Sequence, residues 1–475
     1  MAAAKRSYAG AKVTNSLWSW ATSNLSANQE IYSSLERLRA RSRDLCRNND
    51  YAKKFLRMVR TNVVGPGIKL QSRVKDANGK PDRVANEMIE SAWRQWGKVG
   101  VCEVSGRYSF TDVKNTVISQ MAQDGEVLVR FVRGNGYKYG IALQLIEADH
   151  LDLSYNDPLR NIVMGIEFDE WGRPKAYHLF EKHPGERMGY VQNKRVRIPA
   201  DEILHLFIPD RISQNRGVPW MHTAIVRMNM LYGYEEAELV ASRLAAAKAG
   251  FYVAPPGDEY VGPKDEDGSF VQELEPGVFE VLPSGWDFKP YDPQHPTTAF
   301  KDFVKATLRG IASGLDVSYN YLANDLESVN YSSIRAGVLD EREVWKGLQK
   351  WMIEHFLTPV FEKWLEMALL TGELKLPVAK FEKFNAPSWQ PRGWAWVDPL
   401  KDVQAAILAM QSGLKSATEI AAEQGKDIED VYEQLAREKE LRKKYGITTA
   451  DDAKLLEAMA KIKNEGEEDE AQAAV

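Results

Sequence analysis

The chain has only two cysteines, Cys46 and Cys102, and no apolar run long enough to cross a bilayer. Two cysteines are too few for a disulfide framework or a structural zinc site, so a reducing compartment is expected. A membrane-spanning helix needs about 20 consecutive apolar residues, and the N-terminal sequence MAAAKRSYAG lacks the apolar core of a signal peptide. These absences predict a soluble, intracellular protein with no membrane partner.

Strong charge of one sign is also missing. The 475 residues carry a formal net charge of −5, with 27% charged and 44% hydrophobic residues, which are ordinary values for a globular protein. This balance excludes a uniformly basic nucleic-acid binder, although it leaves room for a local basic patch. The length allows two or three domains with a substantial core.

Motifs for catalysis and metal binding are absent as well. The sequence contains no GxxxxGK[ST] phosphate-binding motif and no HExxH zinc motif. His178 and His183 are separated by a strand end rather than a helical turn, which makes a metal pair a minor alternative. Asp149 and His150 follow a predicted strand and fit a strand cap better than a catalytic edge. We therefore expect no enzyme activity, no cofactor and no metal site.

A basic bias marks the N-terminal helices. Between Leu35 and Lys75 there are twelve Lys or Arg residues against three Asp or Glu residues. A solvated helical face explains this bias better than a patch that contacts phosphates, and both alternatives stay open.

Hydrophobic periodicity predicts an α+β fold. Residues 29–124 have mainly helical patterns, and the break at 48–50 can cap the helix that follows it. Residues 126–208 are rich in β patterns and predict one small β-domain, with hairpin turns at 134–136 and 171–174.

The second half of the chain is largely helical around a proline-rich insert. Residues 250–295 combine prolines with short alternating runs, which favours a compact β-insert over a helical linker. Further along, Ser416 and Glu419 form a capping-box pattern that begins a helix. Residues 446–475 hold eight acids against three bases, so we expect the end of this tail to be disordered.

The segment Phe300–Leu370 places a polar break between two amphipathic helices. The first helix has an apolar stripe and, on a separate face, a cationic line formed by Lys301, Lys305 and Arg309. The break at 316–333 is rich in Asn, Ser and Tyr and contains no Lys or Arg. The second helix is predicted to run from the break to the end of the segment without interruption.

Several phrases, taken in order, resemble the lambda-like portal protein family of tailed bacteriophages. They are RSRDLCRNNDYAKKFLRMVRTNVVGPGIKLQ, DGEVLVRF, LQLIEADHLD, IPADEILHLF, RGVPWMHTAI and LDVSYNYLANDLESVNYSSIRAGVLDE. The resemblance covers roughly residues 31–445, and the last phrase is the most specific. It implies a portal fold and a dodecameric head–tail connector at one capsid vertex of the virion.

The resemblance also implies partners for the ring. Double-stranded DNA would pass through it without sequence readout, while the terminase large subunit drives genome packaging. Major capsid or scaffold proteins would surround the ring, and head-completion or tail adaptor proteins would serve DNA retention, tail attachment and genome ejection. Such a protein assembles in the host cytoplasm and ends in the capsid portal vertex.

The portal regions can be carried over onto this sequence. The expected clip would meet the terminase first and the head-completion proteins later. The regions are a flexible N-terminal segment (1–27), a wing (28–218, with its β-domain at about 126–208, and 317–398), stem helices (219–249 and 296–316), a β-rich clip (250–295), a helical crown (399–445) and an acidic tail (446–475).

On this resemblance the polar break at about 316–333 is a tunnel loop that faces DNA. Uncharged side chains can contact a duplex of any sequence without binding it tightly. We expect the cationic line to stack into basic rings or to pair with acids of the adjacent subunit. The expected DNA-facing residues are Tyr319, Asn320, Tyr321, Asn324, Ser328, Asn330 and Tyr331.

Two alternatives remain open at the level of sequence. Trp345, Trp351 and Trp364 are candidate anchors of the ring interface, but the core of the same subunit is an equal claimant. For function, the second candidate is another virion or mobile-element assembly or adaptor protein that contacts nucleic acid peripherally. An unrecognised nuclease or hydrolase is the third.

Overall fold

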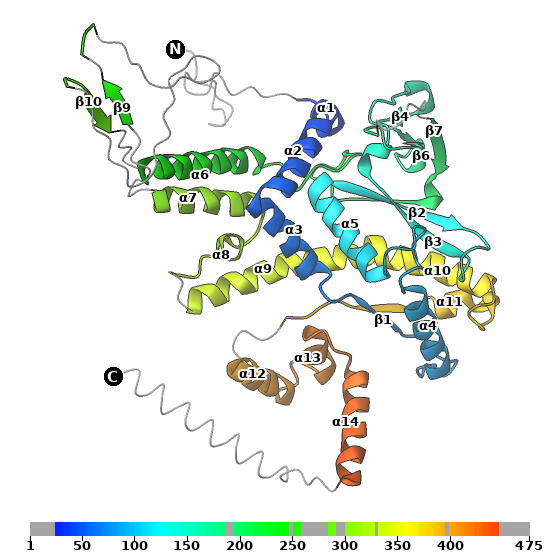
Figure 1. The fold of residues 1–475 in the computed structure, drawn as a ribbon. Coiled ribbons are helices and arrows are strands. Elements are labelled where there is room, and N and C mark those ends of the chain that lie inside the picture. The colour runs from blue at the N-terminus through cyan, green and yellow to red at the C-terminus, as the bar shows by residue number, and fades with distance from the viewer. Residues whose placement is uncertain are drawn as a thin grey trace, which may run out of the picture. The chain divides into compact units, whose positions relative to one another are not determined.

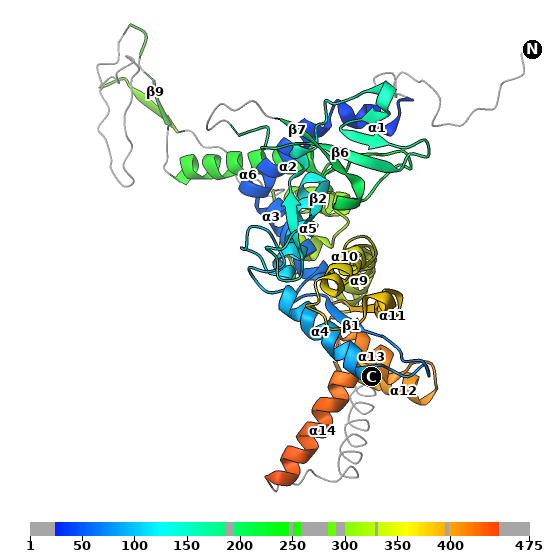
Figure 2. The ribbon, with the colours of Figure 1, turned by 90° about the vertical axis from the view of Figure 1, so that its right-hand side faces the viewer.

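The chain divides into two compact units, residues 1–389 and 390–475. Within the first unit, helices surround two small antiparallel sheets (Figures 1 and 2). Among the described residues, no helix is long and apolar enough to cross a bilayer. The computed structural model describes residues 24–186, 194–246, 250–253, 255–257, 284–290, 300–327, 331–394 and 399–445, so most of the expected clip, the first 23 residues and the tail from 446 lie outside the described part.

The N-terminal third of the first unit is mainly helical, as the sequence predicts. Asn49 Oδ1 accepts hydrogen bonds from the backbone N–H groups of Tyr51 and Ala52 at 3.1 and 3.0 Å, which confirms the predicted cap. The elements are α1 (Ala27–Tyr32), α2 (Leu35–Asn48), α3 (Asp50–Val63), β1 (Lys69–Ser72), α4 (Arg83–Trp96) and α5 (Phe110–Asp124).

The β-rich middle of the chain forms two sheets. The strand orders are β3-β2-β8 and β4-β5-β6-β7, and all neighbours are antiparallel. The pairs β2–β3 and β5–β6 confirm the predicted hairpins. The strands are β2 (Glu126–Arg133), β3 (Ile141–Ile146), β4 (Ile162–Val163), β5 (Ile166–Phe168), β6 (Pro174–Phe180), β7 (Arg195–Pro199) and β8 (Ile203–Phe207).

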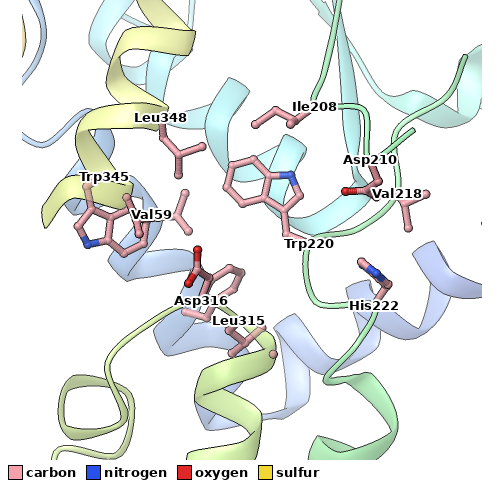
Figure 3. Close-up of a pocket in the computed structure, with 13 residues that line it drawn as sticks. Val59, Ile208, Asp210, Val218, Trp220, His222, Leu315, Asp316, Trp345 and Leu348 are labelled. Carbon is pink, nitrogen blue, oxygen red and sulfur yellow. The ribbon is translucent and has the colours of Figure 1, made fainter. Parts of the chain in front are cut away.

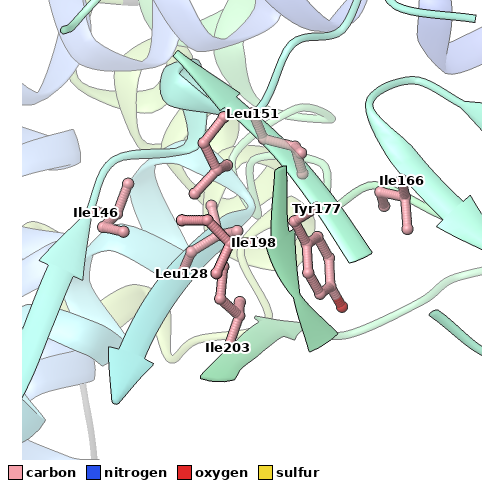
Figure 4. Packing of buried hydrophobic residues seen from close by; sticks show 8 residues of the cluster. Leu128, Ile146, Leu151, Ile166, Tyr177, Ile198 and Ile203 are labelled. Atoms are coloured by element: carbon pink, nitrogen blue, oxygen red, sulfur yellow. The ribbon is translucent and has the colours of Figure 1, made fainter. Parts of the chain in front are cut away.

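One apolar core joins the two sheets (Figure 4). Each of its members is less than 10% exposed, and they come from both sheets and from the connection between them. Burial of such side chains is the main favourable term in folding, so the two sheets stabilise each other. The core residues are Leu128, Ile146, Leu151, Ile166, Tyr177, Leu179, Ile198 and Ile203.

Long helices make up the rest of the first unit. Two short strands, β9 and β10, pair antiparallel at the ends of the proline-rich insert. Strand β11 pairs with β1. The elements are α6 (Ile225–Ala246), β9 (Gly250–Val253), β10 (Asp287–Pro290), α7 (Phe300–Gly314), α8 (Tyr319–Ala323), α9 (Tyr331–Met352), α10 (Thr358–Leu370), α11 (Phe381–Phe384) and β11 (Pro387–Gln390).

A π-helical turn lies within the long second helix that the sequence predicts. It spans Ile353–Leu357, between α9 and α10. Pro359 follows at once; it has no N–H group, and its ring would collide with the carbonyl four residues earlier in a regular α-helix. The wider turn relieves that collision, and the chain stays helical from Tyr331 to Leu370, as the sequence predicts.

The tryptophans of the long helices belong mainly to the core of their own chain. Trp364 is fully buried and its ring lies 5.0 Å from that of Trp93, in an edge-to-face contact. Trp345 is only 3% exposed. Trp351 is half-buried and stacks on His355 at 4.6 Å. Trp345 and Trp364 are therefore core residues and not ring anchors.

A buried carboxylate and its partners connect the helices to the first sheet; we call Glu126, Arg39, Arg216 and His205 the Glu126 cluster. Glu126 Oε1 lies 2.5 Å from Arg39 Nη2 and 2.6 Å from Arg216 Nη2. Its Oε2 lies 2.9 Å from His205 Nε2 and accepts from the backbone N–H of Gly217 at 2.7 Å. Burial opposes the charge, but Arg216 and Arg39 outweigh it and hold the pKa of Glu126 well below its usual range.

Some of the basic side chains of the N-terminal helices point into the protein. Arg39 is 2% exposed, and Arg43 is half-buried with its Nε 2.8 Å from Asp124 Oδ1 and a second ion pair to Asp149. Neither a solvated face nor a phosphate patch describes these two arginines. Their role is structural.

Two glycines bring distant backbone segments into direct contact. A Cβ atom added to Gly125 would lie 2.3 Å from the carbonyl carbon of Val218, and one added to Gly217 would lie 2.1 Å from Gly125 O. Beside them, the N–H of Trp220 donates to Ala122 O at 3.1 Å. The chain entering α6 is thus held against the junction of α5 and β2, where no side chain fits at either glycine.

The second unit contains three helices in its described residues. Ser416 Oγ accepts from the N–H of Glu419 at 3.2 Å, and the Ser416 N–H donates back to Glu419 Oε2 at 2.7 Å, which confirms the predicted capping box. None of the described residues in these helices is buried. They are α12 (Pro399–Gln411), α13 (Ala417–Glu423) and α14 (Ile428–Lys444).

Candidate functional site

The candidate site is the short segment that follows α7. Its helix α8 contacts both α7 and α3 of the same unit (Figure 1). α8 corresponds to the sequence YNYLA, in which Leu322 is only 1% exposed. The expectation of a loop without secondary structure was therefore wrong for residues 319–323, because one buried leucine anchors a helical turn.

Two sharp reversals set the path of this segment. Asp316, after α7, and Asn324, after α8, each have φ of 54°. At both places the next residue donates its N–H to the carbonyl five residues earlier, at 3.1 Å. This pattern ends a helix through a left-handed residue, usually Gly, and Asp and Asn are the side chains that tolerate it best.

Two ion pairs connect the segment back to α7; we call them the α7–loop ion pairs. Lys301 Nζ lies 2.8 Å from Glu327 Oε2, and these side chains are 71% and 74% exposed. Lys305 Nζ lies 3.2 Å from Asp325 Oδ2, and both side chains are 20% exposed. Both pairs form within one chain.

Tyr319 completes this arrangement. Its hydroxyl donates to Asp325 Oδ2 at 2.7 Å, and the Arg309 guanidinium carbon lies 5.5 Å from the ring centre. Hydrogen bonds from Tyr319 and from the Glu327 N–H, together with Lys305, lower the pKa of Asp325 to about 2. Burial and the neighbouring carboxylate raise the pKa of Tyr319 to about 12. At neutral pH, Asp325 is therefore charged and Tyr319 keeps its proton.

A further contact ties the segment to α3. Lys54 Nζ donates to Asn324 Oδ1 at 2.7 Å. Asn324 is thus held both by its left-handed backbone and by its side chain. Asp325 and Glu327 follow shortly after this anchored residue. Their positions relative to α7 are therefore constrained.

The structure brings only part of the predicted DNA-facing set into view. Tyr321 is 45% exposed and Asn324 is exposed, whereas Tyr319 and Asn320 are half-buried. Ser328 and Asn330 lie outside the described residues. Tyr331 is the first residue of α9 and not part of the loop. Whether this set faces DNA stays a prediction.

The cationic line has partners that sequence reasoning missed. We expected Lys301, Lys305 and Arg309 to form basic rings or to pair with an adjacent subunit. In the structure, each contacts a side chain between residues 319 and 327 of its own chain. The one signal in the sequence was the pair of acids, Asp325 and Glu327, in an otherwise uncharged stretch.

An apolar pocket of about 250 Å³ lies behind the first reversal, at Asp316 (Figure 3). It is formed by α3, the end of α7, α9 and the segment 208–222. Its lining is mainly apolar, with Asp210, His222 and Asp316 as the charged or titratable side chains. The lining residues are Phe55, Val59, Ile208, Asp210, Val218, Trp220, His222, Gly314, Leu315, Asp316, Val344, Trp345 and Leu348.

One group of metal-ligand side chains occurs among the described residues, namely Glu147, Asp149 and His183. Asp149 already pairs with Arg43 and lies 3.7 Å from Arg39. Two arginines at the central carboxylate disfavour a bound cation, so these residues do not fit a metal site.

The other suspected catalytic residues also have structural partners. His178 lies 3.5 Å from Glu167 rather than beside His183. His150 Nδ1 lies 2.8 Å from Phe180 O. The first contact joins neighbouring strands β5 and β6, and the second fixes the end of β6.

Comparison with known proteins identifies the relatives of this chain. The family model described as "Phage portal protein, lambda family" matches residues 14–349. The "Probable portal protein" of Halomonas phage phiHAP-1 is 40% identical over 444 residues, which cover 91% of this chain and 86% of that protein.

More distant relatives are similar over the same extent. The "Portal protein" of Escherichia phage N15 is 24% identical and covers 96% of this chain and 94% of its own length. "Portal protein B" of Escherichia phage lambda is 23% identical, with 91% and 88% covered. A solved chain from the neck of a native gene transfer agent particle is 14% identical, with a TM-score of 0.43 over 81% of this chain and 93% of that one.

Proposed function

This chain belongs to the lambda family of phage portal proteins, and we propose that twelve copies of it form a ring with a channel for double-stranded DNA. The match to the family over most of the chain is the observation that carries this proposal. In it, the ring lies at one capsid vertex as the head–tail connector. DNA enters through it during packaging, is retained, and leaves through it at ejection.

The segment 316–333 is the part of the chain that we assign to the channel. It contains no Lys or Arg, and the cations of the adjacent α7 contact residues of the segment. Tyr321 and Asn324 expose uncharged hydrogen-bonding groups. Phosphate contacts by cations dominate affinity for DNA, so a surface with few available cations supports sliding and not tight binding.

The remaining regions serve the partners of the ring. The expected clip, residues 250–295, would bind the terminase large subunit during packaging and head-completion or tail adaptor proteins afterwards. The wing would face major capsid or scaffold proteins. The protein itself acts without catalysis, and it passes from the host cytoplasm into the virion.

The particle formed by the full-length protein tests the proposal first. Light scattering should give a mass close to twelve chains, and negative-stain images should show rings with a central hole. Small oligomers without a hole would contradict the proposal. Divalent-dependent DNA cleavage by the purified protein would contradict its non-catalytic role.

Replacement of residues 320–330 by a Gly-Ser linker of equal length tests the assignment of the loop. Rings should still form, because most of the buried core lies elsewhere. Packaging or retention of DNA should fall sharply, as measured by phage titre and by the DNA content of purified particles. A matched Gly-Ser replacement of the exposed turn Ala77–Gly79 should leave the titre unchanged. A normal titre from the loop variant would refute the assignment.

A further inference from the structure

Two acids hold the nearest cations of α7. Glu327 pairs with Lys301, and Asp325 pairs with Lys305. Asp325 also accepts from Tyr319 at 2.7 Å and from the N–H of Glu327 at 3.2 Å. One carboxylate thus organises the ion pair, the tyrosine and the turn that carries the second acid.

The placement of these acids is fixed from both sides. Before them, the left-handed Asn324 is bound by Lys54 of α3 at 2.7 Å. On the α7 side, Arg309 lies against the ring of Tyr319, whose hydroxyl reaches Asp325. A defined turn therefore positions the two acids beside the cations of α7.

The same pairs are open to competition. The Lys301–Glu327 pair is largely exposed, and exposed ion pairs are weak and screened by salt. A DNA phosphate that reached Lys301 or Lys305 would have to displace a carboxylate that is already in place. Without the carboxylates, both ammonium groups could neutralise phosphates directly.

We infer that Asp325 and Glu327 keep the affinity of the portal channel for DNA low by occupying Lys301 and Lys305. This inference rests on the proposed function, since it concerns the surface along which DNA would pass. It assigns to two acids the task of masking cations that lie on the preceding helix. The partner is the phosphate backbone of double-stranded DNA, of any sequence.

The test compares DNA binding by assembled rings. Wild-type protein and the double variant Asp325→Asn/Glu327→Gln are titrated against a fluorescein-labelled 30-base-pair duplex, by anisotropy, at 50–200 mM NaCl. Each new lysine–phosphate contact should steepen the slope of log K against log salt by about 0.9. Two new contacts per duplex would cost the variant about tenfold more affinity than wild type across this range, and contacts from further subunits of the ring would increase that loss. The variant should bind more tightly than wild type at the low-salt end.

A matched control separates masking from net charge. Glu343 pairs with Lys346 at 2.6 Å on the exposed surface of α9, and Glu354 of the following π-helical turn pairs with Lys350 of α9 at 3.8 Å. The variant Glu343→Gln/Glu354→Gln removes the same two charges and frees two lysines elsewhere. Its binding should match wild type, and an equal gain in both double variants would overturn the inference.

A second variant separates masking from loosening of the loop. Adding Lys301→Ala and Lys305→Ala to Asp325→Asn/Glu327→Gln leaves the loop equally untied but removes the masked cations. The gain in affinity should disappear; a gain that persists would overturn the inference. If the first double variant fails to assemble, Glu327→Gln alone should give about half of its change in slope.

The outcome is distinguishable from failure of the proposed function. Rings without a central hole, or a normal titre after loop replacement, would refute the portal-channel assignment itself. Intact rings and an impaired loop-replacement variant, together with unchanged DNA binding by Asp325→Asn/Glu327→Gln, would refute only the masking by the two acids.

Discussion

Two groups of ion pairs in this protein use the same chemistry in opposite surroundings. In the Glu126 cluster, the carboxylate is fully buried and both of its oxygens are bound by cations or N–H groups. In the α7–loop ion pairs, Lys301 and Glu327 are about three-quarters exposed. A buried charge that loses its partner stays uncompensated, whereas water and salt replace an exposed partner. The first group therefore holds the fold, and the exposed Lys301–Glu327 pair of the second group is free to take part in exchange with a ligand.

The largest effect should follow from breaking the buried group. Glu126→Gln would leave Arg216 buried without its carboxylate partner and Arg39 with only Asp149, 3.7 Å away, and we expect a loss of about 3–5 kcal/mol in the free energy of unfolding. Urea denaturation followed by tryptophan fluorescence would measure it. The control Glu202→Gln breaks the half-exposed pair with Arg130, at 2.9 Å, and should cost about 1 kcal/mol or less. Equal losses of free energy in both variants would show that the buried and the half-exposed ion pairs contribute equally to stability.

Lys114 is a buried cation with no carboxylate partner among the residues that the structure describes, and it sharpens the comparison. Lys114 is 3% exposed, and its Nζ donates to Ile68 O at 3.0 Å. Burial lowers its pKa to about 8. Between pH 8 and the ordinary value of 10.5 the unfolded chain binds more protons than the folded one, so stability should rise with pH in this window. The advantage of wild type over Lys114→Met should grow by about 1–3 kcal/mol between pH 7.5 and 10.

Urea midpoints of the two proteins at these pH values measure that growth. Their difference isolates Lys114, because other groups titrate in both proteins. A difference that stays constant with pH would show that the ammonium is compensated in some other way. In that case the charge of Lys114, like the charges of the Glu126 cluster, would be compensated within the folded protein.

The smallest effect on stability should come from the exposed pair. Glu327→Gln removes the partner of Lys301 at a site that water already reaches, so the melting temperature of the ring should not change measurably. Differential scanning calorimetry at low and high salt would show it. A fall in melting temperature as large as that of Glu126→Gln would mean that the α7–loop ion pairs hold the fold after all.

Local features of the structure were readable from the sequence. The cap at Asn49, the capping box at Ser416 and the hairpin turns depend on residues a few positions apart, and all were predicted correctly. The family followed from the order of several phrases. Pro359 in a helical pattern was visible too, but its consequence depends on whether the helix breaks or widens, which tertiary packing decides.

Contacts between distant residues were not readable. Arg39 and Glu126 are 87 positions apart, so a basic helix gave no sign that one of its arginines points inward. Lys301 and Glu327 are separated by 26 positions and by two left-handed reversals. Hydrophobic periodicity does not show where the chain goes after such turns, and for that reason the sequence predicted basic rings or pairing with acids of an adjacent subunit for the cationic line.

The contact between Gly125 and Gly217 has a mechanical consequence. Main chain touches main chain there, with no side chain between them to bend or to change rotamer. Hydrogen bonds from Gly217 to Glu126 and from Trp220 to Ala122 close the same joint. A force applied along α6 therefore passes to α5 and β2 through a stiff connection. Any displacement of α6 must either carry these elements with it or be absorbed beyond the joint, toward the far end of the helix.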